Sequence, residues 1–191
     1  MAKSKWQKQT LRMRKDHLWK ASPGCNVFVA DRGAVRFDYP HDWVVIPGDT
    51  ATDPIKFHDK QPPDDDCVLQ MTLFRLNPEF DWSGLPLPTM LADCVKGEDR
   101  GVTVLGPVRV VRRQDLELVW TETSWLEEKE QRDARSRHCL ARSGTIVPFF
   151  TLDFWPEHAA RWDPVWETLL NSLRLGEYIA DPRKGARYGY G

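Results

Sequence analysis

The strongest constraint on the fold is a run of strand patterns in the second half of the chain, joined by short polar turns. The segments 116–127 and 145–155 are rich in β-branched and aromatic residues, and the segment 135–144 returns between them after a polar turn. The earlier segment 67–76 places Leu69, Met71 and Leu73 on one face. Strands joined by such short turns run antiparallel, because a parallel pair needs a crossover of about a dozen residues. The sequence therefore predicts an antiparallel sheet built around a meander.

A smaller strand unit is predicted near the start of the chain. The segments 25–30 and 34–39 flank Asp31–Gly33, a short turn that contains the glycine typical of a hairpin. In the second segment, Val35 and Phe37 alternate with polar residues, so one face of this hairpin is expected to be buried.

Two segments carry helical periodicity. The first is 85–95, with Pro88 in its first turn, where the missing N–H costs nothing. The second is predicted to begin at Asp163 as N-cap, with Pro164 at the first helical position, and to stop at Gly176. Its apolar face consists of Val165, Leu169, Leu170 and Leu173. Together with the strands, this order predicts an α+β fold in which helices pack on an antiparallel β-sheet.

Length and charge narrow the possible functions. The chain has 191 residues and a formal net charge of −1 at pH 7, which favours one domain and argues against a general nucleic-acid binder. No apolar run approaches the ~18 residues of a membrane span. The four cysteines are far apart and form no CxxC pair, so we expect reduced core thiols in a cytoplasmic protein without a signal peptide.

The composition divides the chain into three parts: a basic N-terminal arm (1–24), a domain (25–176) and a Tyr/Gly-rich C-terminal tail (177–191). The arm has seven Lys and Arg residues against the single acid Asp16, and it is expected to be an interaction element that folding does not need. Four apolar side chains could make the arm partly helical and dock it on its own domain: Trp6, Leu11, Leu18 and Trp19. A nucleic acid could be bound only through this arm.

Two motifs resemble the PsbP/Mog1-like superfamily over about residues 25–176. The first is the F-x-Y-P-x-x-W segment formed by Phe37, Tyr39, Pro40 and Trp43. The second is the W-x-x-L-L-x-S-L-x-L helix formed by Trp166, Leu169, Leu170, Ser172, Leu173 and Leu175. The resemblance implies a PsbP/Mog1-like α/β/α sandwich. Its members include a photosystem II extrinsic subunit, a Ran-GTPase-binding factor and bacterial adaptor chaperones, so it also implies binding to macromolecules rather than catalysis.

The nine tryptophans are either a Trp-rich core or an aromatic binding surface. Trp43 follows the break at Pro40 and is predicted to anchor the core. Trp120 and Trp125 have opposite parity on one strand, so they are expected to lie on opposite faces of the sheet. A groove could also involve Trp82, Trp155 and Trp162. The candidate binding residues are Trp82, Trp125, Arg135, Arg137, Trp6 and Trp19.

The titratable pairs do not predict catalysis. His138 and Cys139 are adjacent on a strand and point to opposite faces, so they cannot form a nucleophile–base pair. His41–Asp42 is interpreted as a turn. The acidic run Asp64–Asp66 beside His58 lacks the glycine and spacing of a calcium loop. We therefore assign no catalytic residue, no metal site and no cofactor.

Six arginines on the meander could bind an anion, but glutamates on the strand between them favour cross-strand ion pairs on an exposed face. These arginines are Arg109, Arg112, Arg113, Arg135, Arg137 and Arg142, and the glutamates are Glu117, Glu122, Glu127 and Glu128.

The leading hypothesis is a non-enzymatic protein-binding or adaptor module. One alternative is a small-ligand protein or enzyme with a pocket near Trp43 and His58. Another is a subunit of a larger complex, docked through its N- and C-terminal tails. An enzyme would need a concave pocket with convergent polar groups, whereas an adaptor would need an exposed surface for its partner.

Overall fold

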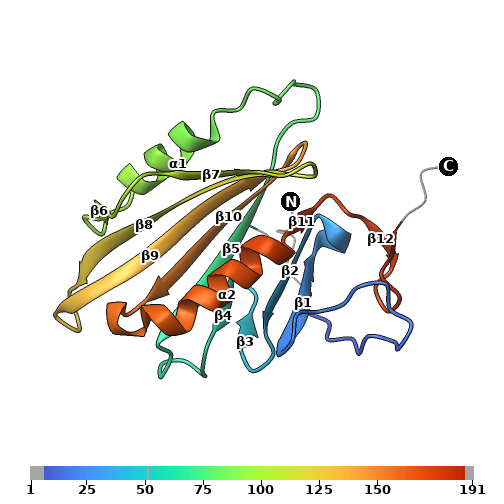
Figure 1. The fold of residues 1–191 in the computed structure, drawn as a ribbon, viewed down its shortest axis with the longest axis horizontal. Helices are drawn as coiled ribbons and strands as arrows, with labels where there is room; N and C mark the ends of the chain where they lie inside the picture. The colour runs from blue at the N-terminus through green and yellow to red at the C-terminus, as the bar shows by residue number, and fades with distance from the viewer. Residues whose placement is uncertain (1–6, 51, 188–191) are drawn as a thin grey trace.

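The computed structural model describes residues 7–50 and 52–187. Its largest element is an eight-stranded sheet of order β3-β4-β5-β10-β9-β8-β6, in which β7 also pairs with β8 (Figure 1). The strands are β3 (Val44–Ile46), β4 (Ile55–His58), β5 (Cys67–Arg75), β6 (Thr103–Val104), β7 (Arg109–Arg112), β8 (Glu117–Glu127), β9 (Arg132–Arg142) and β10 (Ile146–Phe154). All of its ladders are antiparallel, so the predicted meander is confirmed.

The predicted hairpin forms a second, three-stranded sheet. It consists of β1 (Cys25–Ala30), β2 (Val35–Pro40) and β11 (Arg174–Leu175), with the short 3-10 turn η1 (Asp31–Gly33) between β1 and β2. Gly33 has a φ of 102°, and a Cβ there would lie 2.1 Å from the Glu177 carbonyl oxygen. Only glycine therefore fits this close approach to the chain that follows β11.

The first helix agrees with its prediction, whereas the second begins earlier than predicted. Helix α1 spans Leu87–Lys96. Helix α2 spans Ala159–Ser172 and follows the 3-10 turn η2 (Pro156–His158), so Asp163 is not its N-cap and Pro164 lies inside it. The additional first turn carries Trp162, which is 2% exposed and packs edge-on against Trp43. This burial stabilises the turn despite the backbone hydrogen bond that proline cannot donate.

The end of α2 also differs from the prediction. The helix stops at Ser172, four residues before Gly176, because Arg174 and Leu175 pair with Arg36 and Val35 of β2 as strand β11. Gly176 follows this strand and has a φ of 69°.

The helices lie on opposite faces of the main sheet (Figure 1). Trp166 of α2 packs on Trp120 of β8, whereas Leu87 and Leu91 of α1 pack on Val119, the preceding residue. Successive side chains of a strand point to opposite faces, so the two helices are on opposite sides. The predicted α+β sandwich is confirmed.

The larger core lies on the α2 face, where α2 and the small sheet both pack on the main sheet. Trp43 belongs to this core and is 8% exposed, as predicted. On the other face, α1 contacts β8 and β9, and no other helix of the described residues lies there. Val147 of β10 packs in the α1 cluster, so the part of that face left without a helical cover is formed by β5 and by the end of β10 beyond Val147.

The two ends of the described chain run beside each other. The tail contains a second small sheet of β12 (Ile179–Asp181) and β13 (Ala186–Arg187). Backbone N–H groups of Arg14 and Leu18 donate to the carbonyls of Arg183 and Lys184, at 3.3 and 2.9 Å.

Residues 7–24 contain turns and no helix, so the expected partial helix is absent from them. Trp19 is 9% exposed and docks as expected, whereas Leu18 is 71% exposed and Leu11 39%. The expected contact through those two leucines is therefore wrong. Trp6 lies outside the described residues.

Candidate functional site on the uncovered sheet face

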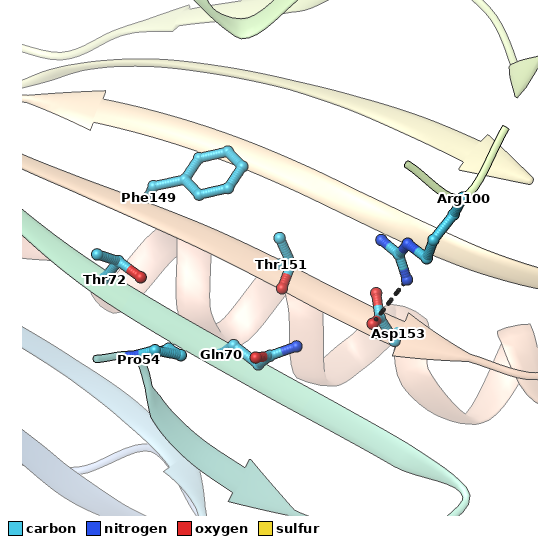
Figure 2. A pocket seen from close by; sticks show the side chains of 7 residues that line it. All are labelled: Pro54, Gln70, Thr72, Arg100, Phe149, Thr151 and Asp153. Carbon is cyan, nitrogen blue, oxygen red and sulfur yellow. Dashed lines mark hydrogen bonds and ion pairs between the residues drawn. The ribbon is translucent and has the colours of Figure 1, made fainter. Parts of the chain in front are cut away.

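The candidate site is a hollow of about 230 Å³ on the uncovered part of the sheet (Figure 2). The strand register brings its floor together: Thr151 of β10 lies opposite Gln70 of β5, and Phe149 lies opposite Thr72. Residues two apart on a strand share a face, so Asp153 extends the same row. Pro54, from the loop before β4, and Arg100, from the loop after α1, complete the rim.

Arg100 is held over the sheet by two carboxylates and an aromatic ring. Its Nη1 donates to Asp153 Oδ2 at 3.1 Å, and its Nε and Nη2 donate to Glu98 Oε2 at 3.0 and 2.7 Å. The guanidinium carbon lies 3.9 Å from the centre of the Trp125 ring. This contact is a cation–π interaction, which fixes the guanidinium plane.

Asp153 is the carboxylate at the edge of the hollow. Its Oδ1 accepts a hydrogen bond from Ser136 Oγ of the neighbouring strand β9. Burial raises the pKa of Asp153 above its ordinary value, although Arg100 and Ser136 act in the opposite direction. The side chain is still 24% exposed, so it faces both the cluster and the solvent.

His138 lies beneath this cluster with no exposed side-chain surface. Its Nε2 is 3.0 Å from Thr123 Oγ1, its Nδ1 is 3.2 Å from Glu98 Oε1, and its ring stacks on Phe149. Burial lowers the pKa of His138 to about 4, so the imidazole is neutral at pH 7. A neutral, buried imidazole packs and orients the residues above it.

Nucleophilic catalysis has no support at this site. Cys139 points to the other face of the sheet, is completely buried, and has a pKa that burial raises well above its ordinary value. The prediction that His138 and Cys139 cannot form a pair is confirmed. In the part of the chain that the structure describes, no group of three or more His, Cys, Asp or Glu side chains could hold a metal ion.

The pocket suggested near Trp43 and His58 involves two side chains that are each 8% exposed. Trp43 packs in the core, and His58 Nδ1 lies 3.1 Å from Asp65 Oδ2 in the acidic turn. Both residues therefore contribute to packing and to the turn.

Of the binding candidates within residues 7–50 and 52–187, only Trp125 lies beside the hollow, beneath the Arg100 that lines it. Trp120 and Trp125 do lie on opposite faces, as predicted, with Trp120 against α2 and Trp125 under Arg100. Trp82 lies on the loop before α1, where its Nε1 donates to the Asn77 carbonyl at 2.7 Å. Trp19 lies in the arm beneath Arg36.

Arg135 and Arg137 lie on the α2 face, where both donate to the Glu122 carboxylate, at 3.0 and 2.8 Å. Arg112 and Arg142 contact Glu117, so the expected cross-strand pairing is confirmed for these four arginines. The expected exposed face is wrong for Arg137, which is 7% exposed. Arg109 instead covers the Trp120 ring.

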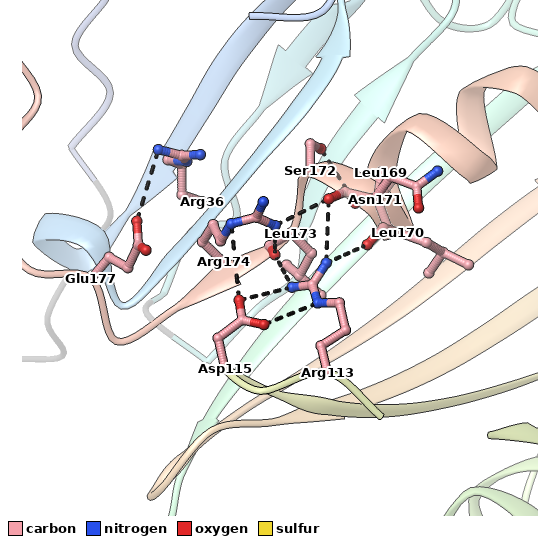
Figure 3. Close-up of polar contacts among 10 residues, drawn as sticks. All are labelled: Arg36, Arg113, Asp115, Leu169, Leu170, Asn171, Ser172, Leu173, Arg174 and Glu177. Carbon is pink, nitrogen blue, oxygen red and sulfur yellow. Dashed lines mark hydrogen bonds and ion pairs between the residues drawn. The ribbon is translucent and has the colours of Figure 1, made fainter. Parts of the chain in front are cut away.

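Arg113 also has no glutamate partner; it contacts backbone carbonyls and an aspartate (Figure 3). Its guanidinium donates to the carbonyls of Leu170, Asn171 and Leu173 at the end of α2, and to the carboxylate of Asp115. The last carbonyls of a helix have no partner within the helix, and a cation there also complements the helix dipole.

The sequence interpretation missed Asp153, Glu98 and Arg100. Asp153 is the only acid in the otherwise apolar strand segment 145–155, and a carboxylate on an inner strand needs a partner. That signal indicates an acceptor for a cation. It does not identify Arg100, which is 53 residues away along the chain.

Comparison with solved structures defines the class of protein. The cyanobacterial PsbP (CyanoP) of Synechocystis sp. PCC 6803 matches with a TM-score of 0.60 and 13% identity, over 83% of this chain and 98% of that one. LpqN of Mycobacterium tuberculosis, described as involved in cell envelope biogenesis, matches with a TM-score of 0.51 and 11% identity, over 78% of this chain and 89% of that one. The fold is PsbP/Mog1-like, as the two sequence motifs indicated.

Sequence comparison identifies the family within this class. The family model Alr1449 matches residues 26–179. The uncharacterized protein alr1449 of Nostoc sp. strain PCC 7120 is 39% identical over 184 residues, which cover 96% of this chain and 94% of the relative. The chain belongs to the Alr1449 family.

Proposed function

We propose that this protein is a non-enzymatic protein-binding or adaptor module, and that it binds its partner on the uncovered face of β5 and β10. One observation carries the proposal: this face has a shallow hollow in place of a covering helix. The side chains of Gln70, Thr72 and Thr151 make no hydrogen bond to any described residue. Polar groups that are not used within the fold can serve recognition at low cost in stability.

The apolar surface next to the hollow supports the same function. Phe74 follows Thr72 on the same face of β5 and is 49% exposed. Ile46 of β3 is 38% exposed and lies opposite Lys56 of β4, on the same side of the sheet. Apolar side chains beside free polar groups are typical of a protein interface.

We propose a cytoplasmic location in a bacterium. All four cysteines are free, and two of them, Cys67 and Cys139, are buried. Unpaired thiols are expected in a reducing compartment. Among the described residues, no helix has the length and apolar character to span a membrane.

The basic arm is a second region to test. The contacts of Trp19, Arg14 and Leu18 argue that part of the arm belongs to the fold. Binding of a nucleic acid or an acidic partner through residues 1–24 stays a prediction. Such binding should weaken steeply as salt rises from low to physiological strength.

The principal test is site-specific photo-crosslinking in cells. With p-benzoylphenylalanine at position 72, we expect a covalent adduct with one partner, because Thr72 lies in the floor of the hollow. The matched control is position 167, because Glu167 is exposed on α2, on the opposite side of the sheet. The identified partner, once purified, should protect backbone amides of β5 and β10 from hydrogen exchange. Adducts at position 167 alone, or equal adducts at both positions, contradict the proposal.

A further inference from the structure

We propose that the hollow bounded by Asp153, Gln70 and Thr151 receives a lysine side chain of the protein partner. The inference rests on the proposed function, and it names the chemistry of the contact at that same site.

The charges of the cluster favour a cation. Arg100 contributes one positive charge, whereas Glu98 and Asp153 contribute two negative charges when both are ionised. His138 is neutral at pH 7 because burial lowers its pKa to about 4, so it does not compensate the excess. Lys56 is a further cation on this face, an exposed residue opposite Gln70 on β4, two strands away from Asp153.

The unused hydrogen-bonding groups also fit an ammonium group. Arg100 directs three of its five N–H groups at the carboxylates of Glu98 and Asp153, so an anionic ligand at this cluster would lie beside two like charges. The floor offers acceptors that no described residue uses: the hydroxyls of Thr72 and Thr151 and the amide oxygen of Gln70. An ammonium group has three donors and no acceptor, and a carboxylate is its strongest partner.

The shape of the hollow suits the rest of a lysine side chain. Phe149 lies on one side and Pro54 on the other, and both offer apolar surface to the methylene groups (Figure 2). Lysine commonly buries its stem along apolar surface while its head reaches a polar group. An ammonium group beside Asp153 would stabilise the ionised carboxylate, which burial disfavours, so binding should weaken at low pH.

The test is an NMR titration of the full chain with Nα-acetyl-lysine-N-methylamide. We expect saturable shifts at the amides of Gln70, Thr72 and Thr151, with a dissociation constant on the order of millimolar. Nα-acetyl-norleucine-N-methylamide keeps the stem and removes the charge, and the corresponding glutamate compound reverses the charge. Both should bind at least tenfold more weakly.

Asp153→Asn should weaken binding of the lysine compound at least tenfold, whereas Asp133→Asn, at an exposed acid on β9, should not change it. Thr151→Val is a second variant, which removes an acceptor and leaves the Arg100 contacts intact; it should weaken binding about threefold. If Asp153→Asn does not fold, the Thr151→Val variant tests whether the lysine compound binds in the hollow. Stronger binding of the glutamate compound, unchanged binding in the variants, or no saturable shift with the lysine compound overturns the inference.

The two proposals fail separately. If position 72 captures no partner but the lysine compound binds as expected, the adaptor function fails and the site chemistry stands. If a partner is captured and the lysine compound does not bind, the adaptor function stands and the site chemistry fails.

Discussion

Arg113 and Arg100 lie in two regions of the molecule, and the two arginine side chains bind different kinds of partner. Arg113 holds three backbone carbonyls at the end of α2, and Arg174 reaches the same Asp115 carboxylate at 3.9 Å (Figure 3). Arg100 holds two carboxylates at the rim of a hollow. Both guanidiniums have several partners, but the partners differ in kind.

The difference separates a structural contact from a surface available to a ligand. Losing Arg113 leaves the buried Leu170 carbonyl without its side-chain donor. The carbonyls of Asn171 and Leu173 keep Arg174 as a donor, at 3.0 and 2.8 Å. Carboxylates beside a hollow can accept from water or from a ligand, so losing Arg100 leaves them solvated. The region around α2 is therefore expected to determine stability, and the face of β5 and β10 is expected to determine binding. Four changes test this division, in decreasing order of effect.

The largest effect should come from the core beneath α2. Trp43→Ala removes a buried ring that packs against Trp162, and it should lower the free energy of unfolding by roughly 3–5 kcal/mol. Urea unfolding measures this loss. A loss below about 1 kcal/mol would mean that Trp43 is not a core residue and would reopen the idea of a site beside it.

The second-largest effect is a loss of stability at low pH, which comes from His138 beneath the hollow. Because the pKa of His138 is about 4 when folded and 6.5 ordinarily, the unfolded chain binds more protons between these values. This contribution to stability is complete above pH 6.5 and is lost as pH falls to 4, at a cost on the order of 3 kcal/mol.

The raised pKa of Asp153 acts in the opposite direction, since its protonation stabilises the folded state as pH falls. Comparing unfolding curves of the protein with those of His138→Gln isolates the histidine, because Asp153 is present in both. The exposed His41→Gln is the control and should keep the original slope. Equal slopes for His138→Gln and the unmodified protein would show that His138 is not buried as described.

The third test compares the two arginines directly. Arg113→Met should lower the free energy of unfolding by about 2 kcal/mol, because the buried Leu170 carbonyl of α2 loses its side-chain donor. Arg100→Met should cost about 1 kcal/mol or less, because its side chain is 33% exposed and its partners can be solvated. If Arg100→Met is the more damaging substitution by denaturant unfolding, the division between the two regions fails.

The smallest effect on stability should accompany a large effect on binding. Phe74→Ser replaces a half-exposed ring on the uncovered face and should change the free energy of unfolding by about 0.5 kcal/mol or less. It should nevertheless reduce photo-crosslinking from position 72. Undiminished crosslinking in a folded Phe74→Ser variant would place the partner elsewhere on the face.

Local sequence patterns were sufficient for most of the secondary structure. Alternation of apolar and polar residues located β2 and β5, strand-like runs joined by short polar turns located β8 to β10, and the 3.6-residue period located α1 and most of α2. These features depend on neighbours a few residues away. The first turn of α2 was missed because it depends on Trp162 packing against Trp43, and no local propensity records such a contact.

Local patterns therefore predicted the antiparallel sheet, the two helices, the burial of Trp43 and the opposite faces of Trp120 and Trp125. The folded chain adds that α1 covers part of one face and that Arg100 contacts Asp153 across the Trp125 ring. Strand alternation assigns a side chain to a face, but the residues that lie above that side chain depend on the path of a distant loop. The hollow depends on strand register and on that loop together, so no single segment of sequence encodes it.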